Sequence, residues 1–132
     1  MAQRTEEVGC TPCLIVAHGD PAYAALLRRS FRRLGWRVHL AESGPAARHL
    51  ARILAPAGVV LATDLPNESG WLTCVKLTAE QPGLKVFLVA SDPTSEGYRF
   101  ADFVGAAALL SKRHGVQTLV DELADTVLPA VG

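Results

Sequence analysis

The stretch GVVLATDLPNESG, residues 58–70, has the pattern of a buried strand followed by a turn. Turns that follow buried strands often carry catalytic side chains, because a rigid strand positions them. The strand ends at Ala62, whose methyl group has no chemistry, and the nearest acid, Asp64, comes two residues later. The stretch therefore predicts either a working site at Asp64 or a turn that keeps its shape without the acid.

Cys10 and Cys13 form C-T-P-C, a spacing typical of redox and zinc sites. Zinc needs about two further ligands, and neither a second C-x2-C nor a closely spaced histidine pair follows. A redox pair normally opens a helix after a strand, whereas this pair precedes the first expected strand. We therefore expect ordinary thiols in a reducing cytoplasm, and a small core residue at Cys74.

The composition excludes several classes of protein. The chain has 132 residues, of which 49% are hydrophobic, enough for one domain with a proper core. Thirteen basic residues balance thirteen acidic ones, so no net charge draws the chain to nucleic acid or to a membrane. No apolar run is long enough to span a bilayer, and the polar start has no signal-peptide core. We expect a cytoplasmic protein with a flexible segment, 1–12, and one domain, 13–132.

Short apolar segments alternate with amphipathic ones along the whole domain. Strands are expected at 13–17, 36–41, 58–62, 84–90 and 107–111, and helices at 21–35, with Pro21 at the first helical position, 44–55, 71–81, 95–105 and 116–131. This order predicts an α/β fold, a doubly wound five-stranded parallel sheet between two helical layers. The binding crevice of such a sheet lies at the carboxyl ends of its strands.

Residues 13–128 resemble a bacterial response-regulator receiver domain. The resemblance rests on LIVAHGDP, VVLATDLPNESG, VFLVAS and GAAALLSK, in this order and with suitable gaps. It implies a flavodoxin-like three-layer sandwich and a role in two-component, phosphorelay signal transduction rather than catalysis. In this family an acidic pair and a phospho-accepting Asp hold Mg²⁺, a Lys offsets the phosphoryl charge, and a hydroxyl resets the neighbouring helix.

Pro66 and Gly70 keep the family's spacing after the acceptor, so they fix the alignment of the site. The matching positions are His18 and Gly19 for the acidic pair, Ala62 for the acceptor, Ala90 for the hydroxyl and Lys112 for the lysine. Only Lys112 keeps the residue type that the family uses. We therefore expect a pseudo-receiver that acts by phosphorylation-independent protein–protein interaction, without a metal or a cofactor.

The alternative is an orthodox phospho-accepting receiver whose acceptor is shifted to Asp64, with Asp20 as a lone metal ligand. Asp20 is also suited to cap the following helix, and Asp64 to lie in a solvated loop with Asn67 and Glu68. Lys112 is expected either to pair with Asp64 or Asp92 or to contact an anion. An enzyme or flavin-binding module on this fold is disfavoured, because no Gly-rich phosphate loop follows the first strand.

Two surfaces could bind a partner protein. The first helix carries a basic stripe, defined as Arg28, Arg29, Arg32 and Arg33. We favour a solvated face, whose arginine stems cover the edge of the helix. The alternative is a docking site for an acidic protein surface, which the resemblance suggests because this helix often meets the phosphodonor in receivers. Direct nucleic-acid binding is disfavoured by the neutral charge.

The fourth helix carries Tyr98, Phe100 and Phe103, and its pattern departs from the family's. Asp102 and Arg99 stand at positions that are packed in receivers, and the two phenylalanines stand at positions that are exposed. We favour a rotated helix that buries the phenylalanines over one that shows them to a partner. The fourth helix, fifth strand and fifth helix form the usual receiver dimer face, so the resemblance also implies a homodimer there.

Overall fold

A five-stranded parallel sheet forms the centre of the molecule, and the computed structural model describes it within residues 12–127. The strands lie in the order β3-β2-β4-β5-β6, and each neighbouring pair is parallel. Their bounds are β2 Cys13–Ala17, β3 Arg37–Ala41, β4 Gly58–Ala62, β5 Lys85–Ala90 and β6 Ala108–Ser111. The predicted sheet is therefore confirmed, while the expected flexible segment lies, apart from Pro12, outside the described residues.

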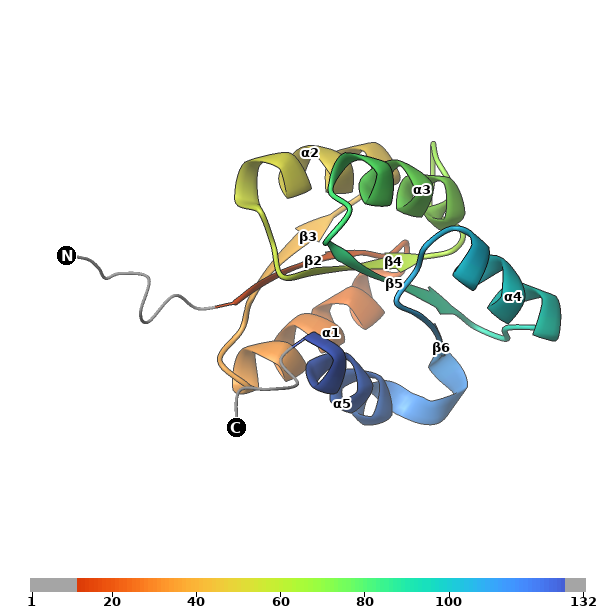
Figure 1. Ribbon diagram of the computed structural model, residues 1–132. Coiled ribbons are helices and arrows are strands. Elements are labelled where there is room, and N and C mark those ends of the chain that lie inside the picture. Colours follow the sequence, from red (N-terminus) through yellow and green to blue (C-terminus); the bar gives the residue numbers. More distant parts are fainter. Residues whose placement is uncertain (1–11, 128–132) are drawn as a thin grey trace.

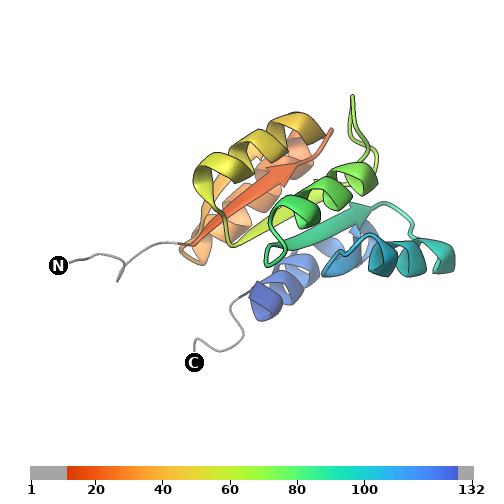
Figure 2. The ribbon, with the colours of Figure 1, turned by 45° about the horizontal axis from the view of Figure 1, so that its top comes forward.

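The helices lie on both faces of the sheet, with α2 and α3 above it and α1 and α5 below it in Figure 1. In the turned view of Figure 2, α2 and α3 lie in front of the sheet and α1, in orange, lies behind it. Their bounds are α1 Pro21–Arg33, α2 Gly44–Leu54, α3 Gly70–Glu80, α4 Ser95–Phe103 and α5 Gly115–Val127, with a 3-10 turn, η1, at Lys112–His114. None of the helices described in this part of the chain is long and apolar enough to cross a membrane.

Side chains at the helix starts explain where several helices begin. The Asp20 carboxylate accepts hydrogen bonds from the backbone N–H groups of Ala22 and Tyr23, which confirms it as the cap of α1. Ser43, by the same kind of bond, caps α2. The first helix begins at Pro21, as predicted, because proline needs no backbone N–H donor at the first helical position.

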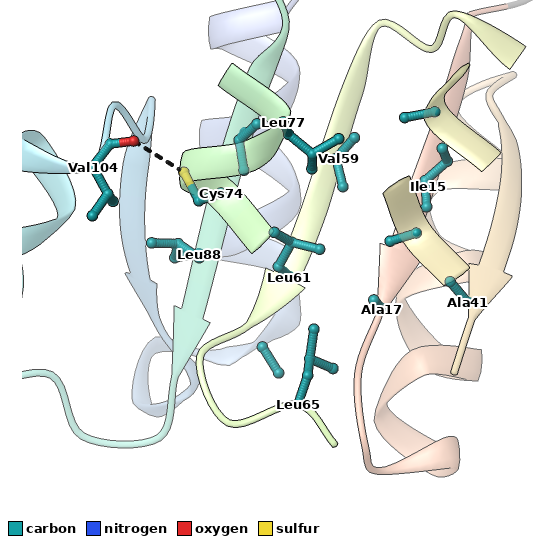
Figure 3. Close-up of a cluster of buried hydrophobic side chains, with 14 of the residues drawn as sticks. Ile15, Ala17, Ala41, Val59, Leu61, Leu65, Cys74, Leu77, Leu88 and Val104 are labelled. Carbon is teal, nitrogen blue, oxygen red and sulfur yellow. Dashed lines mark hydrogen bonds between the residues drawn. The ribbon is translucent and has the colours of Figure 1, made fainter. Parts of the chain in front are cut away.

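The sheet separates two hydrophobic clusters, because successive strand residues point to opposite faces. Leu14, Val16, Val60 and Phe87 pack toward α1 and α5. Ile15, Val59, Leu61 and Leu88 pack toward α2 and α3 (Figure 3). Cys74 lies in this second cluster, where its thiol donates to the Val104 carbonyl at 3.6 Å and burial raises its pKa to about 11. The expected core role of Cys74 is thus confirmed.

Candidate functional site

A hollow of about 250 Å³ opens at the carboxyl ends of the strands, where the topology predicts a binding crevice. It is lined by His18, Gly19, Asp20, Asp64, Val89, Ser91 and Lys112. These residues follow or end four different strands, so the fold gathers polar groups that the sequence scatters. Two expected site positions, Ala62 and Ala90, do not line the hollow, and Ala62 is only 1% exposed.

The turn after β4 is locked at Ala62 by direct contact with Gly70. A Cβ atom at Gly70 would collide with the Ala62 carbonyl, so only glycine lets the two backbones approach this closely. The Gly70 N–H also donates to the Thr63 carbonyl at 2.9 Å, and the Thr63 N–H donates to the Val89 carbonyl at 3.1 Å. The eight-residue spacing between Ala62 and Gly70 therefore has a steric cause, which supports the alignment of Ala62 with the acceptor.

The same turn is held from the other side by Glu68, which the sequence placed in a solvated loop. That expectation is wrong, because Glu68 is only 8% exposed. Asn67 adopts a left-handed conformation, with φ of 69°, just before Glu68. The Glu68 carboxylate accepts from Arg48 of α2 at 3.0 and 3.2 Å. It also accepts from the Thr73 hydroxyl and the Lys76 ammonium of α3, both at 2.7 Å.

The ionisation of Glu68 reflects this set of donors. Burial alone raises the pKa of a carboxyl group, because it penalises the charged form. The hydrogen bonds from Arg48, Lys76 and Thr73 more than offset burial and lower the pKa of Glu68 to about 2. Glu68 thus ties the β4–α3 turn to two helices through a charged group, and its partner Arg48 is too distant in sequence for a local pattern to reveal it.

Lys112 does not form the expected salt bridge. Within residues 12–127, no carboxylate lies within 4 Å of its ammonium, which instead lies 4.3 Å from the centre of the Tyr23 ring. Asp92 pairs with the neighbouring Arg113 at 3.2 Å, and both side chains are exposed. The ring of Tyr23 attracts the cation and holds it at the edge of the hollow. Asp64 is exposed on another part of the same lining.

His18 is fixed as a turn residue. Its Nδ1 accepts from the backbone N–H of Asp20 at 3.0 Å, and its ring lies 4.7 Å from that of Tyr23. Burial lowers the pKa of His18, and the nearby Lys112 ammonium lowers it further. Among the described residues, no group of three or more His, Cys, Asp or Glu side chains could hold a metal ion. The residues present therefore do not fit the Mg²⁺ that receivers use.

The partner surfaces differ in how well the sequence predicted them. All four arginines of the basic stripe are exposed, and they flank a shallow hollow of about 570 Å³ over Ala25. The favoured burial of the α4 phenylalanines is wrong, because Phe103 is 83% and Phe100 is 45% exposed. The smaller Ala101 and Val104 face the core in their place.

The exposed aromatic side chains of α4 adjoin Trp71 of α3, which is half-buried against the core. The Phe100 ring lies 5.0 Å from Trp71 and 6.1 Å from Phe103. Trp71, Phe100 and Val104 line an apolar groove of about 340 Å³ together with Leu72 and Val75. Tyr98 is exposed on the same helix. We call Trp71, Tyr98, Phe100 and Phe103 the aromatic patch.

Comparison with solved structures decides the fold family. The receiver domain of the Francisella response regulator 1452 superposes with a TM-score of 0.83, covering 90% of this chain and 98% of that one, at 18% identity. The chemotaxis protein CheY4 of Vibrio cholerae gives 0.80, covering 86% and 97%, at 15% identity. This chain has the response-regulator receiver fold.

Sequence comparison finds two regulatory proteins that are similar to parts of this chain. The chain is 34% identical to the probable transcriptional regulatory protein TcrX of Mycobacterium tuberculosis over 83 residues. This stretch covers 63% of this chain and 36% of TcrX. It is 26% identical to the photosynthetic apparatus regulatory protein RegA of Rhodovulum sulfidophilum over 112 residues. This stretch covers 85% of this chain and 61% of RegA. The chain thus spans between a third and two thirds of these relatives. No family model matches it.

Proposed function

We propose that this receiver-fold chain is a pseudo-receiver, which acts in two-component signal transduction by protein–protein contact without phosphorylation. The observation that carries the proposal is Ala62 at the end of β4, locked in place by its contact with Gly70. A phosphoryl group needs an oxygen nucleophile, and a methyl group offers none. The relatives TcrX and RegA are named as regulatory proteins, which supports a signalling role.

The state of the neighbouring positions supports the same proposal. Gly19 has no side chain to bind Mg²⁺, and His18 uses its Nδ1 as an acceptor within the turn. Asp20 uses a carboxylate oxygen to cap α1. A receiver that has no phospho-accepting Asp needs neither Mg²⁺ nor the hydroxyl that responds to the phosphate. Ala90, which stands at the hydroxyl position at the end of β5, agrees with this loss of phosphorylation.

One observation favours a second candidate, an orthodox receiver that accepts phosphate on Asp64. Asp64 lines the same hollow as Lys112, the cation that offsets phosphoryl charge in receivers. The two candidates make opposite predictions for Asp64, because only the second requires a bond to its carboxylate. This candidate lacks acidic ligands for Mg²⁺, because among the described residues Asp20 is the one acid besides Asp64 that lines the hollow.

We assign partner contact to the aromatic patch. Apolar side chains as exposed as Phe103 are unfavourable in water, and exposed aromatic clusters are typical of protein interfaces. The patch covers parts of α3 and α4, the helices that follow β4 and β5, and the carboxyl ends of these two strands carry two of the altered positions, Ala62 and Ala90. A partner can bind the aromatic patch without phosphorylation at the acceptor position.

Beryllofluoride, which mimics a phosphoryl group on a carboxylate, tests the proposal. We expect no signal for bound fluoride by ¹⁹F NMR when the wild-type chain is mixed with Mg²⁺ and beryllofluoride. The triple variant His18→Asp, Gly19→Asp, Ala62→Asp supplies all three acidic residues and is expected to bind it. The double variant His18→Asp, Gly19→Asp is the matched control and is expected not to bind, since the acceptor is still missing. A bound signal in the wild type that disappears in Asp64→Asn would favour the orthodox candidate.

A further inference from the structure

The α1/α5 side of the molecule carries two helical faces of opposite charge. The basic stripe lies on α1, where Arg29 and Arg33 are opposite the buried residues of the helix and Arg28 and Arg32 lie beside them, all four exposed. On α5, Asp121, Glu122 and Asp125 are exposed opposite the buried Leu119 and Leu123, and we call these three the acidic stripe. Because α1 and α5 cover the same face of the sheet and both stripes are exposed, the two stripes meet solvent on the same side of the molecule.

The two stripes are neighbours, yet they are not paired with each other. The helices α1 and α5 are in contact beneath the sheet (Figures 1 and 2). They run parallel, because each follows a strand of the same parallel sheet. Within residues 12–127, no salt bridge involves either stripe, and Asp121 accepts only from Gln117 at 2.8 Å. Each stripe is therefore available to a partner of opposite charge.

We propose that this partner is a second copy of the same chain, with the basic stripe of each copy on the acidic stripe of the other. A two-fold axis parallel to the helices and midway between them brings α1 over α5 and α5 over α1. Such an interface is self-complementary, and it forms both sets of contacts at once. The hollow over Ala25, flanked by the four arginines, gives the acidic helix a place to lie.

The chemistry predicts a weak dimer that depends strongly on salt. Exposed ion pairs contribute little singly, but two symmetric sets act together here. Salt screens them, because the Debye length falls from about 10 Å at 0.1 M to about 3 Å at 1 M. The inference shares with the proposed function only the view that the chain acts through protein contacts, and it is independent of whether Asp64 accepts phosphate.

Sedimentation velocity of the full chain, without any phosphodonor, tests the dimer. We expect the dissociation constant to rise at least tenfold between low and high salt. Arg28→Glu with Arg32→Glu, or Asp121→Arg with Asp125→Arg, is expected to abolish the dimer at concentrations where the wild type associates. An equal mixture of the two double variants is expected to recover a dimer, because both sets of charges are then complementary again. Circular dichroism of each variant checks that it is folded.

Several results would overturn the dimer. A wild-type chain that stays monomeric at low salt contradicts it, and so does a mixture that fails to recover association between folded variants. The variant Phe103→Ser alters the usual receiver dimer face, formed by α4, β6 and α5, and leaves the α1/α5 face unchanged. An unchanged dissociation constant for this variant supports the α1/α5 contact, and loss of the dimer refutes it. Phosphorylation of the wild type would defeat the proposed function while leaving this measurement unaffected.

Discussion

Replacing Glu68 by glutamine is expected to lower the free energy of unfolding by about 2–3 kcal/mol at pH 7. The substitution removes the charge that Arg48 and Lys76 share, and it leaves the half-buried Arg48 guanidinium without its counter-charge. One pKa unit is worth about 1.4 kcal/mol, and the pKa of Glu68 is lowered from its ordinary 4.5 to about 2, which sets an upper limit of about 3.5 kcal/mol on its contribution. Urea unfolding of the two proteins at pH 7 measures the difference.

The pH dependence of this difference follows from the direction of the pKa shift. The folded-state pKa is depressed, so the contribution of Glu68 is fully present above its unfolded pKa, about 4.3. It is lost as the pH falls toward the folded-state pKa of about 2. The wild type and Glu68→Gln are therefore expected to differ by a constant amount above about pH 5 and to converge between about pH 4 and pH 2.

Glu80→Gln is the matched control for this prediction. Glu80 pairs with Arg52 at 3.4 Å across the same two helices, but both side chains are exposed. A pair of this kind contributes less than about 1 kcal/mol, so the control is expected to leave stability almost unchanged. Equal effects of the two substitutions, or an effect of Glu68→Gln that persists at about pH 2, would contradict the assigned role of Glu68.

Gly70→Ala is expected to destabilise the fold by about 2–4 kcal/mol. The added methyl group meets the Ala62 carbonyl, which belongs to the backbone and cannot rotate away as a side chain could. Relief requires the β4–α3 turn to shift, which weakens the Gly70–Thr63 hydrogen bond. Thermal or urea unfolding measures the loss.

Gly83→Ala is the control, since a methyl group at Gly83 meets nothing within 4 Å and its φ is not positive. It is expected to change stability by less than about 0.5 kcal/mol. If Gly70→Ala were as mild as Gly83→Ala, the turn would not be locked at Ala62. The alignment of Ala62 with the phosphoacceptor would then lose its structural support.

The fold was predictable because its signals are local. The alternation of apolar runs with amphipathic segments indicates parallel strands and helices, and Asp20 and Ser43 mark helix starts by their side chains. The ends of elements were less accurate: the first helix stops at Arg33 and the fourth at Phe103, each followed by a glycine of positive φ two residues later.

The site was predictable only in part, because several of its contacts join distant residues. Glu68 and Arg48 are 20 residues apart, and nothing between them indicates that the loop turns inward. The cation of Lys112 rests on Tyr23, a residue from the far end of the chain, so a salt bridge was the simpler expectation. On α4, the small Ala101 is buried and the larger Phe103 is exposed, so the size of the apolar side chains did not indicate which face of the helix packs on the core.

Reaction of the chain with acetyl phosphate and Mg²⁺, followed by intact mass spectrometry, tests the central claim most directly. We predict that the wild type gains no phosphoryl group, because the position that should accept it is Ala62. Asp64→Asn is then expected to behave as the wild type does. A wild-type chain that gains one phosphoryl group, together with an Asp64→Asn variant that gains none, would contradict the claim and establish Asp64 as the acceptor.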